Sequence, residues 1–414
     1  MKNTLAILCL LATMLFACEN KGELKPGDLA KVADPVFLKY CLDNFDTNKN
    51  GKLNAKEAAA VKEIDVFGLP LTSLAGIEVF ANLEIFRCED KLLTDPHFFT
   101  SMPLEYLLRN TNELTEMDFS KNTALSKLYC SGNKLTKIDV RNCTQLKDLR
   151  CSNNPLTELN LSNNTALAIL YCSHNLLTEL NLSTNTQLVD LKCDFNQLTK
   201  LDVGNHSALK NLNCNNNQLT SLDVSNNPAL TGLICSYNQL TNFDVRHSAQ
   251  LIELRCNNNR LTELDISNST QLKALYCEAN QLTKLDVGKN TKLTRLLCSQ
   301  NRLTELDVSK NTRLNLLYCG NNQLTKLDVS KNTALSTLNC SHNRLTELDI
   351  SKNTELTSLG CYINQLTELD VRKNTRLQSL NCSKNKISTI HVWRGFNIYN
   401  EDYIKPDGAR YVKP

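Results

Sequence analysis

The stretch from Leu128 to Asn154, LYCSGNKLTKIDVRNCTQLKDLRCSNN, contains one phrase and the beginning of its repetition. Its cysteines Cys130 and Cys151 lie one repeat of 21 residues apart. The ladder cysteines, as we call the full set, are Cys130, Cys151, Cys172, Cys193, Cys214, Cys235, Cys256, Cys277, Cys298, Cys319, Cys340, Cys361 and Cys382. From Leu114 to His391 the period has almost no insertions, and such a fixed period predicts a solenoid.

Each repeat divides into two halves that share the pattern LxxLxxxxN, as in residues 125–133 and then 135–140. Within LYC (128–130) and IDV (138–140), apolar residues alternate with exposed ones, which is the period of a half-buried strand. We therefore expect a mainly β solenoid of about 13 coils with two short parallel strands per coil. Neighbouring coils would stack about 4.8 Å apart over a core of Leu, Val, Ile and Cys.

Asparagine occupies the ninth position of the first half from Asn112 and Asn133 onward to Asn385. A buried amide can donate to and accept from the backbone of adjoining turns, which satisfies groups that a tight corner would leave unpaired. The matching position of the second half varies more in residue type. Asn164, Asn185, Asn227 and the residues from Asn290 to Asn374 keep it, whereas Cys143, His206, Ser248 and Ser269 replace it.

The ladder cysteines allow three interpretations: a disulfide framework, a metal site or a packed core. In-register parallel neighbours hold their Cβ atoms about 4.8 Å apart, beyond the roughly 3.5–4.5 Å of a relaxed disulfide. A linear row also cannot present four sulfur atoms tetrahedrally around one zinc ion. Because free cysteine behaves as a small, often buried apolar side chain, we expect the row to be core.

The repeats resemble the 21-residue class of bacterial leucine-rich repeat proteins, written LxxLxCxxNxLTxLDVSxN, and are similar to those of internalin-like surface proteins. The resemblance covers about two thirds of the chain. It implies a curved solenoid that serves as a binding scaffold without catalysis of its own, used for adhesion or interaction. It does not identify a ligand.

The N-terminus has a charged beginning and a short apolar run from Leu5 to Ala17, which is typical of a secretory signal. The run ends in Leu15-Phe16-Ala17-Cys18, which resembles the lipobox of bacterial lipoproteins, although Phe16 replaces the usual small residue. This predicts acylation of Cys18 and a lipid-anchored location in the cell envelope, at the outer membrane. The alternative is an ordinary signal peptide with an incidental cysteine.

The chain therefore divides into six predicted segments. They are a lipoprotein signal peptide (1–18), a linker (19–33), an EF-hand-like helix-loop-helix (34–66), degenerate N-terminal capping repeats (67–110), the repeat array (111–391) and a C-terminal cap (392–414). Both ends are expected to cover the open strand edges of the terminal coils.

Residues 46–57 fill every constrained position of the EF-hand calcium loop. The expected oxygen ligands are Asp46, Asn48, Asn50, the Lys52 carbonyl, Asn54 through water, and Glu57. Only Asp46 and Glu57 are anionic, so we expect a weak, structural calcium site of the order of 0.1–1 mM, as in extracellular modules. The alternative is a loop that keeps the fold without the ion.

The residues just before the ladder cysteines are expected to face solvent at the centre of the first strand. This pre-cysteine column contains the candidate ligand-binding residues Tyr129, Arg150, Tyr171, Lys192, Asn213, Ile234, Arg255, Tyr276, Leu297 and Tyr318. Tyr and Arg are enriched at binding hot spots, although bulky residues also suit solvated strands. On the other strand, a row of aspartates from Asp118 to Asp370 is expected to form a solvated charged face, with a calcium-collecting ladder as the weaker alternative.

Composition restricts the partners. A net charge of +3 from 46 basic and 43 acidic residues argues against nucleic acid. The six histidines do not recur beside a nucleophile, which argues against a hydrolase. We therefore expect a protein or glycan ligand and membrane contact through the lipid anchor only. A structural subunit of a cell-surface assembly is the alternative, and the oligomeric state stays open.

Overall fold

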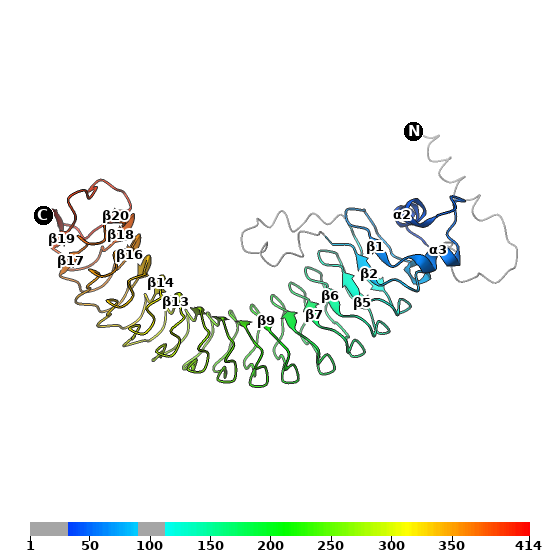
Figure 1. Cartoon of the computed structure of the whole chain (residues 1–414), viewed down its shortest axis with the longest axis horizontal. Helices are drawn as coiled ribbons and strands as arrows, with labels where there is room; N and C mark the ends of the chain where they lie inside the picture. Colours follow the sequence, from blue (N-terminus) through cyan, green and yellow to red (C-terminus); the bar gives the residue numbers. More distant parts are fainter. Residues whose placement is uncertain (1–31, 90–111) are drawn as a thin grey trace.

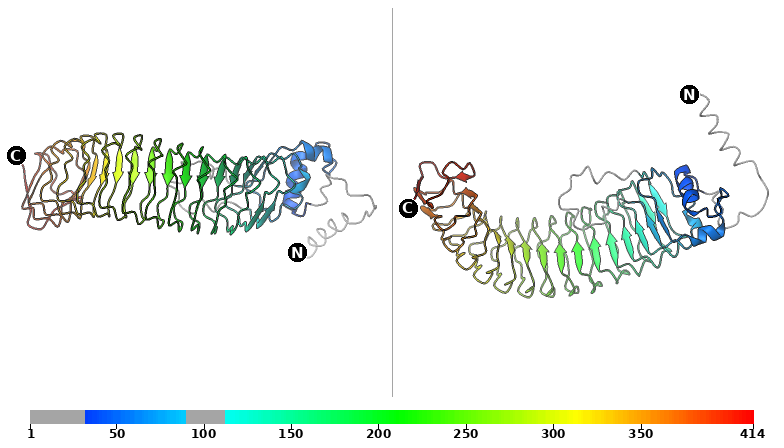
Figure 2. Two further views of the ribbon diagram at one scale, coloured as in Figure 1. Left: turned by 90° about the horizontal axis from the view of Figure 1, so that it is seen from below. Right: turned by 45° about the horizontal axis from the view of Figure 1, so that its top comes forward.

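A single parallel sheet runs along the molecule in the computed structural model, which describes residues 32–89 and 112–414. Its 16 strands are, in spatial order, β1 (Glu63–Asp65), β2 (Ile85–Arg87), β4 (Lys127–Tyr129), β6 (Asp148–Arg150), β7 (Ile169–Tyr171), β8 (Asp190–Lys192), β9 (Asn211–Asn213), β10 (Gly232–Ile234), β11 (Glu253–Arg255), β12 (Ala274–Tyr276), β13 (Arg295–Leu297), β14 (Leu316–Tyr318), β15 (Thr337–Asn339), β16 (Ser358–Gly360), β18 (Ser379–Asn381) and β20 (Tyr403–Ile404). The strands lie side by side along an arc (Figure 2). The predicted solenoid is confirmed, and β1, β2 and β20 lengthen it beyond the thirteen regular coils.

The expectation of two strands in every coil is wrong for most of the molecule. On the second side, strands form only near the ends: β3 (Glu116–Asp118) pairs with β5 (Lys137–Asp139), and β17 (Glu368–Asp370), β19 (Thr389–His391) and β21 (Arg410–Val412) form a three-stranded sheet. Between them only the bridge of Asp223 with Asp244 is found in the described chain. The sheet lies on the concave side of the arc (Figure 1), and the coils fan apart on the convex side, where they lose the spacing that a ladder requires.

The core runs through the whole solenoid as stacked rows of leucine and cysteine. Each ladder cysteine is 0% exposed, and every described cysteine is a free thiol. The middle residue of each regular strand is a buried leucine, such as Leu296 in β13. The core interpretation of the ladder is therefore confirmed, and Cys88 extends the row by one coil.

Asparagine amides join each corner to the next coil. Asn154 Nδ2 donates to the carbonyl oxygens of Cys130 (3.1 Å) and Cys151 (3.1 Å), and its Oδ1 accepts from the Leu135 N–H (3.0 Å). In the second half, Asn164 Nδ2 donates to the preceding corner, while its Oδ1 has no partner. Both rows of corner amides thus connect coils rather than single turns.

A helical segment covers the N-terminal end. It comprises α2 (Pro35–Phe45), α3 (Ala55–Ala60) and, after β1, the 3₁₀ turn η2 (Ile77–Val79). Asp34 caps α2, and its Oδ2 also accepts from the Thr72 N–H (2.8 Å), which ties the helix to the first coil. Phe37 and Phe45 of α2 pack against Phe80. Because β1 already belongs to the sheet, the solenoid begins inside the segment expected to be helix-loop-helix.

The register jumps once, between β2 and β4. These strands pair directly, with Ile85 opposite Lys127, two repeat lengths further along the chain. Asn112 completes the coil that β2 begins, because its Nδ2 donates to the Cys88 carbonyl (3.1 Å) as the later asparagines do. Strands β2 and β4 are therefore direct neighbours in the sheet, although the capping repeats are predicted to continue through residue 110. Residues 90–111 lie outside the described chain, as do the predicted signal peptide and Cys18.

The C-terminal residues add one strand to each of the two sheets at this end. Strands β20 and β21 pair with β18 and β19, so the C-terminal segment covers the edges of the last array strands as expected, and β20 and β21 themselves form the outermost strands of their sheets. Phe396 covers the apolar core, with Trp393, Tyr403 and Tyr411 packed around its ring. In the described part of the chain, no helix is long and apolar enough to cross a bilayer.

Candidate functional site

The pre-cysteine column lies on the concave face as the third residue of each strand, not at its centre. Because strand side chains alternate, the first residue of each strand faces the same side and forms a second column. The members from Arg150 to Tyr318 are half-exposed, whereas Tyr129 is only 5% exposed. The expectation that the column faces solvent is therefore wrong for Tyr129.

In the N-terminal coils the column is a stack of alternating rings and cations. The Arg87 guanidinium lies 4.5 Å from the Tyr129 ring centre, and Arg150 lies 5.0 Å from the rings of both Tyr129 and Tyr171. The Lys192 ammonium follows at 4.3 Å from Tyr171. Such contacts form here because in-register coils place equivalent side chains next to each other, and each is worth about 0.5–2 kcal/mol.

Acidic residues of the second column complete this stack. The Tyr129 hydroxyl donates to Asp148 Oδ2 (2.9 Å), and Arg150 binds both Asp148 oxygens at 3.1 Å. The Tyr171 hydroxyl donates in the same way to Asp190 Oδ2 (3.1 Å). Burial and the neighbouring Asp148 carboxylate raise the pKa of Tyr129 to about 12, so the phenol stays a donor. The stack is thus a rigid surface whose polar groups already bind one another.

Further along the arc the concave face becomes more apolar. Arg255 pairs with Glu253 (2.6 Å) and lies 4.7 Å from the Tyr276 ring centre. On the next two strands, Leu297 of β13 lies in register with Tyr276 and with Tyr318 of β14. Both Leu297 and Tyr318 are half-exposed. The half-exposed residues of β12–β14, namely Ala274, Tyr276, Leu297, Leu316 and Tyr318, form what we call the apolar trough. The exposed Arg295 of β13 lies in register between Ala274 and Leu316, so the apolar residues are contiguous in the pre-cysteine column only.

The predicted calcium loop connects α2 and α3. Gly51 has a φ of +78° and allows the sharp turn, and Leu53 is buried, as the loop pattern requires. Glu57 lies across the loop, where its carboxylate accepts from the N–H groups of Thr47 (3.1 Å) and Asn54 (3.0 Å). Hydrogen bonds from Asn54 and from the Thr47 hydroxyl lower the pKa of Glu57, so the carboxylate is ionised at neutral pH.

The remaining loop side chains also fit a hard cation in type, because they present carboxylate and amide oxygens. Asp46 Oδ2 accepts from the Gly51 N–H (2.8 Å), and Asn50 Oδ1 accepts from the Lys52 N–H (2.9 Å). Asn54 instead caps α3 with its side chain. Helix α3 ends at Ala60, and β1 then joins the sheet from Glu63.

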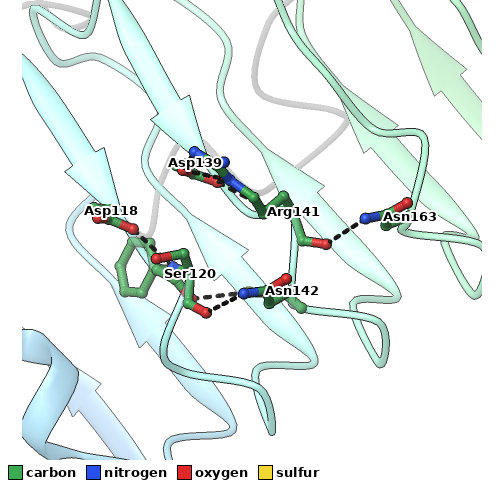
Figure 3. Close-up of polar contacts among 8 residues, drawn as sticks. Asp118, Ser120, Asp139, Arg141, Asn142 and Asn163 are labelled. Atoms are coloured by element: carbon green, nitrogen blue, oxygen red, sulfur yellow. Dashed lines mark hydrogen bonds and ion pairs between the residues drawn. The ribbon is translucent and has the colours of Figure 1, made fainter.

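The aspartate row on the convex side has a local structural role. Asp118 accepts from the Ser120 N–H (2.8 Å), and Asp139 accepts from the Arg141 N–H (3.1 Å) and pairs with its guanidinium (Figure 3). Asn142 then bridges to the neighbouring coil by donating to the Ser120 carbonyl (2.8 Å). Each carboxylate therefore stabilises its own turn. Across residues 32–89 and 112–414, no group of three or more His, Cys, Asp or Glu residues is arranged to hold a metal ion.

The chain is similar to solved bacterial leucine-rich repeat structures over most of its length. The functional domain of InlJ from Listeria monocytogenes, whose structure includes a cysteine ladder, is 35% identical, with a TM-score of 0.75 over 89% of this chain and 82% of that one. The chain belongs to the internalin-like bacterial leucine-rich repeat proteins.

Two less similar structures show the shared fold alone. They are the internalin InlF of Listeria monocytogenes, with 21% identity and a TM-score of 0.59 over 92% of this chain and 96% of that one, and a leucine-rich repeat protein of Leptospira interrogans, with 23% identity and a TM-score of 0.63 over 85% and 94%. No protein-family model and no curated protein sequence matches the chain.

In this internalin-like protein, the solenoid brings the whole pre-cysteine column onto one face, but the sequence reasoning missed its acidic partners. Asp148 and Asp190 occupy the second column, which the period of two along each strand predicts as concave. The candidate calcium ligands gather separately at the N-terminal end, on α2, α3 and their connection.

Proposed function

We propose that this internalin-like protein is a non-catalytic scaffold of the cell envelope whose concave sheet binds a protein ligand. The apolar trough carries the proposal, because its half-exposed apolar side chains lie on three neighbouring strands of the concave sheet. Contiguous exposed apolar surface is typical of interaction sites, and tyrosine is enriched at their hot spots. Arg255 of the neighbouring strand β11, held against the Tyr276 ring and paired with Glu253, would supply a polar contact at the edge of the trough without further ordering.

The location rests on the sequence. The resemblance of residues 15–18 to a lipobox supports acylation of Cys18 and anchoring in the outer membrane. Several acyl chains would hold the protein firmly where one would not. Mass spectrometry of the N-terminal peptide tests this, since an unmodified mature N-terminus at any other residue would contradict it.

The binding test uses an array of cell-surface and extracellular proteins probed with residues 19–414. Replacing Tyr276 and Tyr318 with Ala should weaken the strongest interaction at least tenfold, or about 1.4 kcal/mol, because both rings are lost from the trough. Glu305→Ala, an exposed change on the convex side, is the matched control and should bind normally. Equal binding by all three proteins would contradict the proposed face.

The calcium loop is proposed to fasten the helical segment onto the first coil. Titration calorimetry should detect one calcium ion per chain, with a dissociation constant of about 0.1–1 mM, because only two ligands are anionic. Asp46→Ala should abolish the heat, and the matched change Asp43→Ala, one turn before the loop, should retain it. Micromolar affinity, or no heat at several millimolar calcium, would contradict the proposed weak site.

A further inference from the structure

A column of left-handed residues runs along one rim of the sheet. The second residue after each ladder cysteine has a φ between 50° and 56° in the twelve regular coils from Asn153 to Lys384. This conformation favours glycine and asparagine, and the column uses Asn at several of these positions. Phe195 and Tyr237 are bulkier than the conformation favours, and together with His174 they occupy three of the four coils from β7 to β10.

These bulky side chains are also exposed. Phe195 and Tyr237 are 44% and 53% exposed, and Leu176 beside them is 44% exposed. The His174 and Phe195 rings stack 4.1 Å apart with planes 11° from parallel, so this part of the rim is already ordered. Exposed aromatic residues at conformationally unfavourable positions call for a functional explanation, because neither the core nor the backbone requires them there.

Hydrogen-bonding groups line the inner side of this rim. Asp194 is 8% exposed, and its Oδ1 accepts from Ser173 Oγ (2.6 Å) and Asn213 Nδ2 (2.9 Å). Asn215 Oδ1 is buried and has no partner in the structure. The Phe195 N–H donates to the Asn215 carbonyl (3.0 Å), which places the aromatic rim and the amides next to each other.

The two exposed aromatic residues of the rim are separated by one coil that carries a smaller residue. Phe195 and Tyr237 lie two coils apart in the same column, about 9.6 Å at the usual spacing of about 4.8 Å per strand. The smaller Asn216 lies between them. A separation of about two strand spacings is of the size that one six-membered ring between two aromatic side chains would need.

The pKa values of Asp194 and His174 on this rim are shifted in the directions that favour the neutral forms. Burial raises the pKa of Asp194, and burial of the ring against its neighbours lowers the pKa of His174. The amides of Asn213, Asn215 and Asn216 are uncharged. An uncharged ligand that offers both hydroxyl donors and acceptors suits these groups, whereas a polyanion finds no cluster of cations on this rim.

We propose that the rim over β7–β10 is a second binding site, independent of the apolar trough, for a neutral glycan. A pyranose ring would lie over Asn216 with its C–H groups against Phe195 and Tyr237. Its hydroxyl groups would donate to Asn215 Oδ1 and Asp194. The middle of the arc, where β7 and β9 are labelled in Figure 1, would then present the glycan site on its rim and the protein site further along the concave face.

Affinity electrophoresis of the full chain through gels containing galactomannan, xyloglucan or β-glucan tests this proposal, with polygalacturonate as the anionic comparison. At least one neutral polysaccharide should retard the protein, and polygalacturonate should not. Phe195→Asn with Tyr237→Asn should weaken the retardation at least tenfold. Because asparagine is the residue that the same column uses elsewhere, this variant keeps the backbone conformation, and its unfolding midpoint should not fall.

Ile363→Asn is the matched control, since it changes a bulky residue of the same column in a distant coil and should leave retardation unchanged. The variant with Tyr276 and Tyr318 changed to Ala should also be retarded normally, which separates this site from the trough. Absence of retardation by every neutral polysaccharide would overturn the proposal. So would normal retardation of the Phe195 and Tyr237 variant, or loss of only protein binding in that variant.

Discussion

Replacing Asn311 with Asp is expected to destabilise the solenoid by about 3–5 kcal/mol at neutral pH, since it leaves a buried, unpaired charge. Asn311 is 0% exposed, and its Nδ2 donates to the carbonyl oxygens of Val287 (2.9 Å) and Asn290 (3.0 Å). Aspartate has nearly the same shape but no donor, so its carboxylate would face two carbonyl oxygens in a dry corner. Urea unfolding followed by circular dichroism measures the change.

Two matched variants separate this corner effect from a general loss of amide groups. Asn311→Ser introduces the residue that the chain itself uses at Ser248 and Ser269, and it should cost about 1–2 kcal/mol, because one short donor replaces two bonds. Asn268→Asp removes an exposed amide that bonds the Arg246 carbonyl (3.0 Å), and it should cost less than about 1 kcal/mol. If Asn311→Asp and Asn268→Asp lowered the free energy of unfolding by similar amounts, the corner amides would not be what holds the coils together.

The periodic part of this fold is predictable because one repeat determines its neighbours. An in-register stack places every leucine, cysteine and corner asparagine on its counterpart, so one period of 21 residues predicts the core and the corners together. The missing convex strands were not predictable from the alternation in IDV. Curvature separates the coils on that side, and curvature is a property of the assembled arc rather than of one coil.

The sequence did not reveal the register jump between β2 and β4, for a different reason. The skipped interval between the Cys88 and Asn112 positions is longer than usual by one repeat length, so the asparagine phase is the same before and after it. A degenerate coil and a register jump of one repeat length therefore give the same asparagine spacing in the sequence. The acidic partners of the pre-cysteine column could have been predicted from the sequence. Asp148 lies 19 residues after Tyr129, which places it in the next coil beside the tyrosine.

The ladder cysteines are expected to resist thiol reagents in the folded protein, although the chain is predicted to be exported. Each is 0% exposed, and burial raises the pKa of Cys235 and Cys340 to about 12. Only the thiolate reacts, so ionisation and access both oppose modification. Labelling of residues 19–414 by iodoacetamide at pH 8 should be at least about 1000-fold slower than in urea, because it requires opening of the core.

The variant Thr304→Cys is the control for access of the reagent. Thr304 is exposed on a corner of the coil that contains Cys298, so its replacement adds one exposed thiol to the folded protein. This one thiol should react at the rate of a free peptide while the ladder stays unlabelled, and peptide mass mapping identifies the modified site. Rapid labelling of several ladder positions would mean that the row is accessible and not core. Recovery of disulfide-linked ladder peptides from non-reduced protein would contradict the interpretation as well, because the spacing of about 4.8 Å exceeds that of a relaxed bridge.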